Sequence, residues 1–219
     1  MGNNITELVF ILDMSGSMQP LTADTIGGFN SMLAKQRKEP GTAFVSTVLF
    51  NTESTVIHDR LPLEKVPELT NSDYIPGGGT ALLDAVGGAI HHIGNIHKYA
   101  REEDVPDKTL VVITTDGMEN NSRSYDITKV KSMIERQQTK YGWEFIFLGA
   151  NIDAAETAGS MGIDRRNAVD YRADSKGSGL VFGAIDKVMT FARRGMSCCE
   201  SDEWREELDE DFAERGGKR

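Results

Sequence analysis

Short, fully apolar runs alternate along this chain with longer stretches in which apolar residues recur at helical spacing. The two clearest runs cover residues 8–12 and 110–113, and each run stops at polar residues. A run of this kind is typical of a strand that is buried on both faces of a parallel sheet. Further strands are predicted over residues 43–50, 54–61, 143–148 and 167–171.

The stretches between these strands carry the helical pattern. Apolar residues recur at helical spacing over residues 21–33 and 82–93, and two more helices are predicted over residues 127–138 and 179–192. Strands that alternate with helices predict a three-layer α/β/α sandwich around a mainly parallel sheet. Only residues 51–53 separate two of the strands, which suits a hairpin, so we expect one antiparallel edge strand.

The last part of the chain has a different character. Residues 5–195 carry the pattern of one domain, whereas residues 196–219 form a tail in which nine acidic and four basic side chains give a net charge of −5. Trp204, Leu208 and Phe212 recur every four positions, so they would form one narrow apolar stripe on a short amphipathic helix. Such a helix would dock onto the domain itself, onto a partner or onto a second copy of the chain.

Charge and cysteine content narrow the classes of function. The 219 residues carry a formal net charge of −10, whereas a nucleic-acid-binding protein needs a basic face, so we expect no nucleic-acid partner. We find neither a secretion signal nor an apolar run of about 18 residues, the length that suggests a membrane helix. The two cysteines, Cys198 and Cys199, are adjacent and give no disulfide framework. We therefore expect a cytoplasmic protein without membrane contact.

Oxygen-bearing side chains follow the ends of two predicted strands. Asp13, Ser15 and Ser17 come directly after the first strand, Asp116 follows the strand of residues 110–113, and Thr80 follows three glycines. Ligands of parallel sheets bind beyond the carboxyl ends of the strands, where these side chains are expected to meet. Oxygen ligands without sulfur or imidazole select a hard cation, namely Mg²⁺, Mn²⁺ or Ca²⁺. Two carboxylates only just neutralise such an ion, so a carboxylate from a partner protein would complete the site.

These residues also have plain structural alternatives. Asp13 and the two serines could cap the first helix, and Thr80 could cap the helix that follows it, because Asp, Ser and Thr are favoured at helix N-termini. Asn151 and Asp153 follow a later strand and could line the same face of the sheet. Four histidines are expected in packing or surface positions, namely His58, His91, His92 and His97.

The residues on either side of the candidate site leave a similar choice. Glu119, Asn120 and Asn121 would either contact a ligand or lie in a solvated loop after Asp116. Met18 and Met118 would either form an apolar rim or pack within the turns. The sequence alone does not decide between these roles.

Three motifs occur in a fixed order at these positions. They are Asp13-x-Ser15-x-Ser17, then Gly77-Gly78-Gly79-Thr80, then Thr115-Asp116-Gly117. With the flanking residues 10–12 and 81–85, they resemble the metal-ion-dependent adhesion site of von Willebrand factor A (VWA) domains. The resemblance covers about residues 5–194 and implies a Rossmann-like fold with a six-strand sheet.

The resemblance also implies a set of metal ligands and a function. Ser15, Ser17 and Thr80 would bind the metal directly, while Asp13 and Asp116 would bind it directly or through water. VWA domains commonly bind protein ligands rather than catalyse reactions, which implies that this chain is not an enzyme. The chain resembles an intracellular bacterial or phage-type member of the family rather than an adhesin.

Two other functions remain open at this point. A Mg²⁺-dependent phosphohydrolase would use Asp13 as its nucleophile, but haloacid-dehalogenase-like enzymes carry a second acid two residues on, where this chain has Ser15. A dinucleotide-binding protein would account for the three glycines, but the first strand-to-helix turn lacks the G-x-G-x-x-G pattern. We therefore expect a non-enzymatic, metal-dependent protein-binding module.

Overall fold

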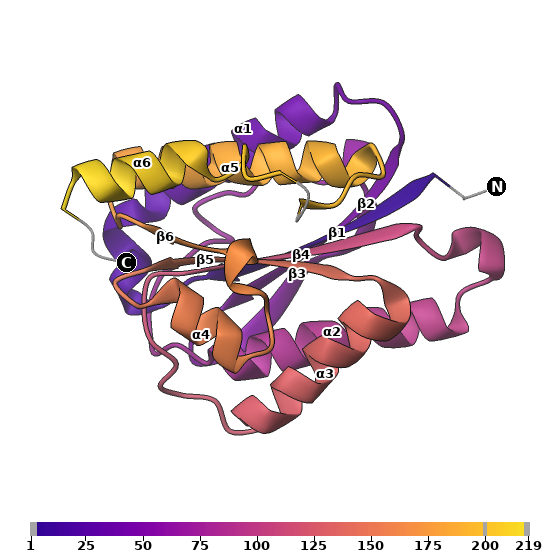
Figure 1. Cartoon of the computed structure of the whole chain (residues 1–219), viewed down its shortest axis with the longest axis horizontal. Coiled ribbons are helices and arrows are strands. Elements are labelled where there is room, and N and C mark those ends of the chain that lie inside the picture. Colours follow the sequence, from indigo (N-terminus) through magenta and orange to yellow (C-terminus); the bar gives the residue numbers. More distant parts are fainter. Residues whose placement is uncertain (1–3, 199–200, 217–219) are drawn as a thin grey trace.

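The computed structural model describes residues 4–198 and 201–216, and within them one six-stranded sheet carries helices on both faces (Figure 1). The strands are β1 (Ile5–Asp13), β2 (Thr42–Phe50), β3 (Ser54–Pro62), β4 (Lys108–Thr115), β5 (Glu144–Ala150) and β6 (Ala168–Tyr171). The helices are α1 (Thr22–Gln36), α2 (Leu82–Tyr99), α3 (Ile127–Tyr141), α4 (Ala154–Ser160), α5 (Ser175–Arg193) and α6 (Glu206–Glu214).

The sheet has the strand order β3-β2-β1-β4-β5-β6, and its strands are parallel except for the antiparallel pair of β2 and β3. The predicted fold class, a mainly parallel six-strand sheet with one antiparallel edge strand, is therefore confirmed. The chain leaves β1 toward β2 and β3 and then crosses back to β4 on the other side of β1. Strand order consequently reverses between β1 and β4, the place where α/β sheets bind their ligands.

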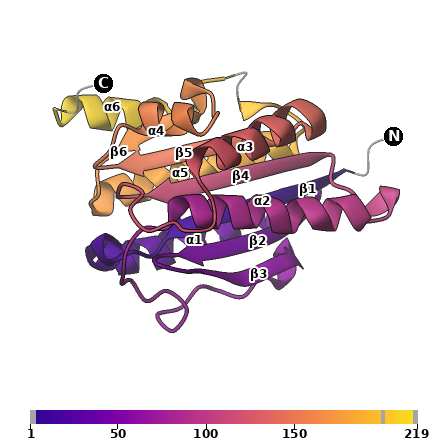
Figure 2. The same cartoon turned by 90° about the horizontal axis from the view of Figure 1, so that it is seen from below.

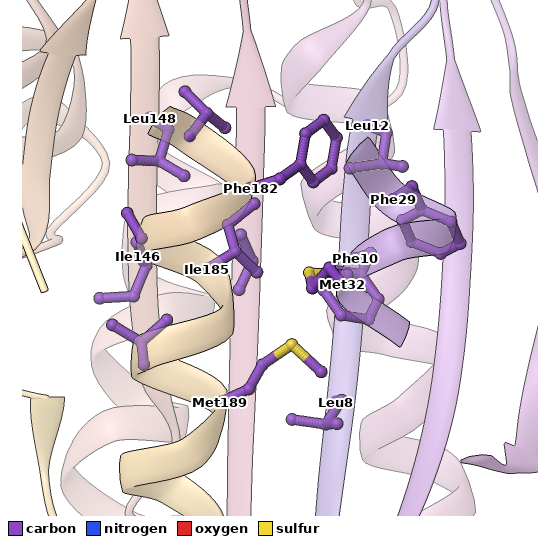
Figure 3. Packing of buried hydrophobic residues seen from close by; sticks show 14 of the residues in the cluster. Leu8, Phe10, Leu12, Phe29, Met32, Ile146, Leu148, Phe182, Ile185 and Met189 are labelled. Carbon is purple, nitrogen blue, oxygen red and sulfur yellow. The ribbon is translucent and has the colours of Figure 1, made fainter. Parts of the chain in front are cut away.

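The two faces of β1 supply two separate cores. Leu8, Phe10 and Leu12 pack with the layer of α1, α5 and α6, whereas Val9 and Ile11 pack with the layer of α2, α3 and α4. Figure 3 shows the first of these cores, with β1 residues facing side chains of α1 and α5. Alternate side chains of a strand point to opposite faces, so a strand covered on both faces needs an unbroken apolar run.

Helices α1 and α5 approach each other closely at Gly28. A Cβ atom added to Gly28 would lie 2.2 Å from Cδ2 of Phe182, so only glycine fits beside that ring. The neighbouring Phe29 meets Phe10 edge to face, with ring centroids 5.4 Å apart. The close approach allows Phe182 and Phe29 to cover the end of β1 near Leu12 (Figure 3).

Helix α4 is an element that the sequence analysis does not predict. Its sequence consists largely of alanine, glycine and small polar residues, so no apolar stripe marks it. Asp153 begins the helix, because its Oδ1 accepts a hydrogen bond of 2.7 Å from the backbone N–H of Glu156. Asp153 is thus the N-cap residue of α4, and a contribution of Asp153 to the same face as the candidate site stays a prediction.

The acidic tail folds back onto the domain. Trp204 and Leu208 are 1% and 2% exposed and belong to the core beneath α5 and α6. Lys187 on α5 donates a hydrogen bond of 2.7 Å to Glu207, which reinforces the contact. Docking onto the domain itself is thus one outcome that the structure shows, while self-association stays a prediction.

None of the helices in residues 4–198 and 201–216 combines the length and the apolar composition that a membrane crossing requires.

Candidate metal site

The candidate site lies where β1 and β4 end side by side. Leu12 pairs with Thr114 in the parallel register of these strands, so Asp13 and the residues after Thr115 emerge at the same edge of the sheet. Asp13, Ser15, Thr80 and Asp116 are all at least 96% buried, since their exposed fractions are 1%, 2%, 3% and 4%.

The carboxylate of Asp13 is held on both oxygens. Oδ1 accepts a hydrogen bond of 2.7 Å from the backbone N–H of Ser15, and Oδ2 accepts one of 2.6 Å from Oγ1 of Thr115. The backbone carbonyl of Asp13 accepts a further bond of 2.5 Å from the hydroxyl of Tyr74. Asp13 is therefore fixed in one orientation at the end of β1.

A chain of hydroxyl groups connects the two loops of the site. Oγ of Ser15 lies 3.0 Å from Oγ of Ser17, and Oγ of Ser17 donates a hydrogen bond of 2.5 Å to Oδ1 of Asp116. A Cβ atom on Gly117 would lie 3.7 Å from Oγ1 of Thr80 and 3.9 Å from Oγ of Ser17, which places both hydroxyls against the same glycine. The structure thus brings together all five residues that the sequence singles out.

The glycine run before Thr80 fits tightly against the loop that follows β1. The backbone N–H of Gly77 bonds to the carbonyl of Met14, and the carbonyl of Gly78 accepts from the N–H of Gly16. Gly78 has φ +74°, and a Cβ atom there would lie 2.5 Å from Oγ1 of Thr52. A residue with a side chain would be both strained and blocked at this position.

The loop after Asp116 is attached to the start of α2. Oδ1 of Asn120 accepts a hydrogen bond of 2.9 Å from the N–H of Thr80, and the N–H of Asn120 donates to the carbonyl of Thr80. Oε2 of Glu119 accepts from the N–H of Leu83 at 2.9 Å. Asn120 and Glu119 therefore position the site. The sequence left these roles open, because the distance from residue 80 to residue 120 hides the pairing.

The helix-cap alternatives do not describe these residues. Ser15 precedes a 3₁₀ helix (Gly16–Leu21) but makes no side-chain capping bond to it. Helices α1 and α2 begin after Leu21 and Ala81, whose side chains cannot accept a capping bond. The oxygen atoms of Ser15 and Thr80 are thus not used as caps.

Burial makes the two carboxylates costly to ionise in the protein alone. Burial raises the pKa of Asp13 above its ordinary value, although hydrogen bonds from Ser15 and Thr115 oppose the shift. Burial also raises the pKa of Asp116, and the nearby charge of Asp13 raises it further. Among the described residues no Lys or Arg forms an ion pair with either carboxylate. A bound divalent cation would relieve both effects.

The donor set fits a hard cation better than a transition metal. Within residues 4–198 and 201–216 no three His, Cys, Asp or Glu side chains are grouped as metal ligands. Any cation at this site would therefore depend on the hydroxyls of Ser15, Ser17 and Thr80 in addition to the two carboxylates. Such an all-oxygen set is the one that Mg²⁺, Mn²⁺ and Ca²⁺ prefer.

The other candidate residues lie around this group in different roles. Met18 is 5% exposed and packs in the core, whereas Met118 is 73% exposed. Nδ2 of Asn151 donates a hydrogen bond of 3.3 Å to the carbonyl of Asp116, so Asn151 contacts the loop of the site. His58 is buried on β3, where Nδ1 lies 3.0 Å from Oγ1 of Thr47, and burial lowers its pKa.

Comparison with known sequences decides the family of this domain. A sequence-family model described as a VWA domain containing CoxE-like protein matches residues 3–143, which is more than half of the chain. The chain belongs to this family. The matched segment includes all five candidate ligands of the VWA metal site. A comparison with curated proteins gave no match.

Solved structures of several other proteins share the fold at low sequence identity. A mutant PilB minor pilin from Streptococcus sanguinis has a TM-score of 0.61 at 12% identity, with 84% of this chain and 61% of that chain covered. Proximal thread matrix protein 1 from the mussel byssus, with a zinc-occupied MIDAS motif, has a TM-score of 0.57 at 15% identity, with 84% and 46% covered. A von Willebrand factor type A protein from Catenulispora acidiphila has a TM-score of 0.54 at 16% identity, with 84% and 42% covered. The chain thus spans between 42% and 61% of the length of these proteins.

Proposed function

We propose that this VWA domain is a non-enzymatic module that binds a partner protein through a divalent cation. Asp13, Ser15, Ser17, Thr80 and Asp116 would hold the ion, with Mg²⁺ as the expected metal and Mn²⁺ or Ca²⁺ as alternatives. A Glu or Asp carboxylate of the partner would complete its coordination. The observation that carries the proposal is the pair of buried carboxylates, which hydroxyl groups connect. Among the described residues no basic side chain forms an ion pair with either carboxylate.

The charge of the site explains why it would bind an acidic side chain. Two carboxylates balance one divalent ion, and the three hydroxyls add no charge, so the bound ion would stay electrophilic. Asp13 and Asp116, the two acidic residues that would hold the ion, are buried at the strand ends. Ser17, in contrast, is exposed, which leaves an approach from solvent beside it.

The surroundings of the site support a protein ligand rather than a free ion alone. Met118 is 73% exposed and Ile75 is 63% exposed. Both belong to the loops of the site, since Met118 follows Asp116 by two residues and the N–H of Ile75 contacts Sδ of Met14 at 3.2 Å. Large apolar side chains that stay exposed beside a polar centre are a feature of protein interaction surfaces.

Hydrolytic catalysis by Asp13 has less support. A nucleophilic carboxylate must be reached by its substrate, yet Asp13 is only 1% exposed. The neighbouring Ser15 also cannot replace a general acid.

We further propose a cytoplasmic site of action, because the two cysteines are adjacent in the sequence and give no disulfide framework. A bacterial or phage origin stays a prediction.

The proposal is tested by capture of partners from cell extract in three parallel conditions. The conditions are the tagged chain with Mg²⁺, the same chain with EDTA, and the double variant Ser15→Ala with Ser17→Ala in Mg²⁺. We expect one set of proteins to be retained only in the first condition. The Glu or Asp of the identified partner that contacts the ion is then replaced by Gln or Asn. This replacement should abolish binding of the purified pair.

Two results would contradict the proposal. Partner retention in EDTA and by the double variant that equals retention by the unmodified chain in Mg²⁺ would show that the metal site takes no part in binding. Turnover of phosphate esters in Mg²⁺ that is lost in Asp13→Asn would instead favour the phosphohydrolase.

A further inference from the structure

A second candidate site lies at the opposite end of the sheet. A cavity of about 360 Å³ opens between α2 and α3 above the start of β4. Figure 2 shows these two helices side by side on one face of the sheet. Thr109 lines the cavity and Asp116 belongs to the metal site. The two residues are seven positions apart along β4, a distance of ~23 Å at about 3.3 Å per residue. The cavity is therefore independent of the metal site.

The walls of the cavity are apolar and include an aromatic ring. Ile90 on α2, Met133 on α3 and Trp143 before β5 contribute to its lining. Trp143 is 5% exposed, and its ring meets that of His97 edge to face at 5.4 Å. The volume lies at the small end of the range for small-molecule sites, about 300–1,000 Å³. The cavity thus has room for one flat organic molecule.

A glycine on α2 keeps the space between the helices open. Gly94 lines the cavity opposite Gln137 of α3, and a Cβ atom added to it would meet Nε2 of Gln137 at 3.4 Å. That neighbour is the mobile end of a side chain, so a larger residue at position 94 would extend into the cavity rather than break the backbone. Gly94 is consequently a position at which the cavity can be filled selectively.

The rim of the cavity is basic although the whole chain is acidic. His91, His97, Lys98 and Arg136 line it, and no Asp or Glu does, in a chain with a net charge of −10. Nζ of Lys98 lies 4.9 Å above the ring of Tyr99 rather than beside a carboxylate. Among the described residues neither Lys98 nor Arg136 forms an ion pair. Positive charge is therefore available at the mouth.

Acidic side chains around the cavity are engaged elsewhere. Two of them adjoin lining residues in the sequence: Oε1 of Glu135 lies 4.0 Å from Nζ of Lys131, and Oε1 of Glu144 accepts a hydrogen bond of 2.9 Å from Nζ of Lys108. Oδ2 of Asp104 accepts a hydrogen bond of 2.8 Å from Arg101, and Oδ2 of Asp107 accepts one of 3.2 Å from the N–H of Ile5. Glu7 is buried and accepts from Nε of Arg60 at 2.8 Å. His97 is the rim residue nearest an acid, since its Nε2 lies 3.6 Å from Oε2 of Glu7.

We propose that this cavity binds a small aromatic carboxylate. The ring of the ligand would lie between Ile90, Met133 and Trp143, and its carboxylate would face Lys98 and Arg136 at the mouth. An apolar pocket with a few convergent polar groups is the general form of a small-molecule site, and here those groups are cationic. The proposal does not depend on the function of the metal site.

The test uses indole-3-acetate and its neutral relative indole-3-acetamide as probes of the full-length protein. Each probe is titrated into the protein, and binding is measured from the shifts of the backbone amide signals in NMR spectra. We expect indole-3-acetate to shift the amide signals of Gly94 and Trp143 and to bind roughly fivefold more tightly than the amide, as one or two solvent-exposed charge contacts allow. Gly94→Leu should abolish binding. Gly88→Leu on the same helix, where an added Cβ meets nothing within 4 Å, should leave binding unchanged.

A second variant separates charge from shape and does not disturb the core. The double variant Lys98→Met with Arg136→Met keeps both aliphatic stems, so it should bind the acid and the amide equally. Lys131→Met, outside the cavity, serves as its control. The proposal is overturned if neither probe shifts Gly94 and Trp143, if the amide binds as tightly as the acid to the unmodified protein, or if Gly94→Leu, still folded, retains binding.

Discussion

Ser17 Oγ donates a hydrogen bond of 2.5 Å to Oδ1 of Asp116, and so joins two loops whose residues lie 99 positions apart in the sequence. A hydroxyl that donates its proton keeps its lone pairs available to another partner. Ser17 can therefore orient Asp116 and still offer an oxygen to a cation. This contact explains how a loop after β1 and a loop after β4 form one site.

Removing this hydroxyl should weaken metal binding more than it weakens the fold. In Ser17→Ala the carboxylate of Asp116 loses the hydrogen bond that lowers its pKa, and the proposed cation loses one ligand. We expect at least a tenfold loss of Mn²⁺ affinity in calorimetric titration, about 1.4 kcal/mol. Ser17 is exposed, but the buried carboxylate of Asp116 loses a hydrogen bond, so the free energy of unfolding without metal should fall by about 1 kcal/mol.

The matched control is Ser31→Ala. Ser31 is also an exposed serine, and it lies on α1 away from the strand ends. Its replacement should leave Mn²⁺ affinity unchanged. An equal loss of affinity in both variants would argue against a specific role of Ser17.

The two buried carboxylates should affect the pH dependence of stability in opposite directions in the metal-free and the metal-bound protein. The pKa values of Asp13 and Asp116 are raised in the folded state above the ordinary 3.8. Their contribution to stability without metal is therefore fully present below the ordinary pKa and is lost as pH rises through the raised pKa values. A cation needs both groups ionised, so the stabilisation it gives should grow with pH.

Thermal unfolding in EDTA and in Mg²⁺ at a series of pH values checks this prediction. The variant Asp13→Asn separates the effect of Asp13 from that of other titrating groups, because Asn carries no charge. The hydroxyl of Thr115 can still donate a hydrogen bond to the carbonyl of Gly117, which lies 3.1 Å away. Relative to the unmodified protein in EDTA, the variant should gain stability at neutral pH and should show no response to Mg²⁺. A Mg²⁺ response of the same size in both proteins would exclude Asp13 as a ligand.

The loop after Asp116 should contribute to metal affinity and stability, because it holds Thr80 in place. In Asn120→Ala the N–H of Thr80 loses its acceptor, so the hydroxyl of Thr80 is no longer held against Gly117. We expect Mn²⁺ affinity to fall severalfold and stability to fall by about 1–3 kcal/mol, the usual cost of a buried group left without its partner. Calorimetric titration and denaturant unfolding measure the two effects.

Asn121→Ala is the control for this prediction, because no hydrogen bond of its side chain is seen in the described part of the chain. Its effect on metal affinity should be small. If Asn121→Ala weakened Mn²⁺ binding as much as Asn120→Ala, the contact with Thr80 would not be the cause.

Two adjacent glycines of α1 should respond oppositely to replacement by alanine. A Cβ atom at Gly28 would overlap the ring of Phe182, so Gly28→Ala should destabilise the protein by about 1–3 kcal/mol. A Cβ atom at Gly27 meets nothing within 4 Å, so Gly27→Ala should stabilise the helix by about 0.5–1 kcal/mol. Denaturant unfolding of both variants checks the sign. A stabilising Gly28→Ala would contradict the close packing of α1 on α5.

The sequence predicts the sheet well because its strands are buried on both faces. The runs of residues 8–12 and 110–113 have no polar interruption, whereas the partly exposed edge strand β3 is marked by the short hairpin that precedes it. Helix α4 escapes prediction because its buried residues, Ala154 and Ala158, are too small to mark an apolar stripe. Its start is signalled only by Asp153, which resembles a site residue because it also follows a strand.

The candidate ligands could be predicted because each follows a recognisable local signal, a strand end or a glycine run. The residues that hold these ligands in place could not be predicted in the same way. Thr115 and Asn120 act through contacts with residues 102 and 40 positions away, and no local pattern records a pairing over such distances. The basic cavity between α2 and α3 is hidden for the same reason, since His97, Lys98 and Arg136 come from two helices whose alignment only the fold determines.

Titration with a metal ion shows whether Asp13, Ser15, Ser17, Thr80 and Asp116 form a cation site. Mn²⁺ is titrated into the EDTA-treated and dialysed full-length protein and, in parallel, into the double variant Ser15→Ala with Ser17→Ala, with the fold of both checked by circular dichroism. We expect one bound ion per chain in the unmodified protein, displaceable by Mg²⁺, and no saturable binding in the folded variant. Absence of binding in the unmodified protein, or equal binding in the two proteins, would contradict a metal site at these residues.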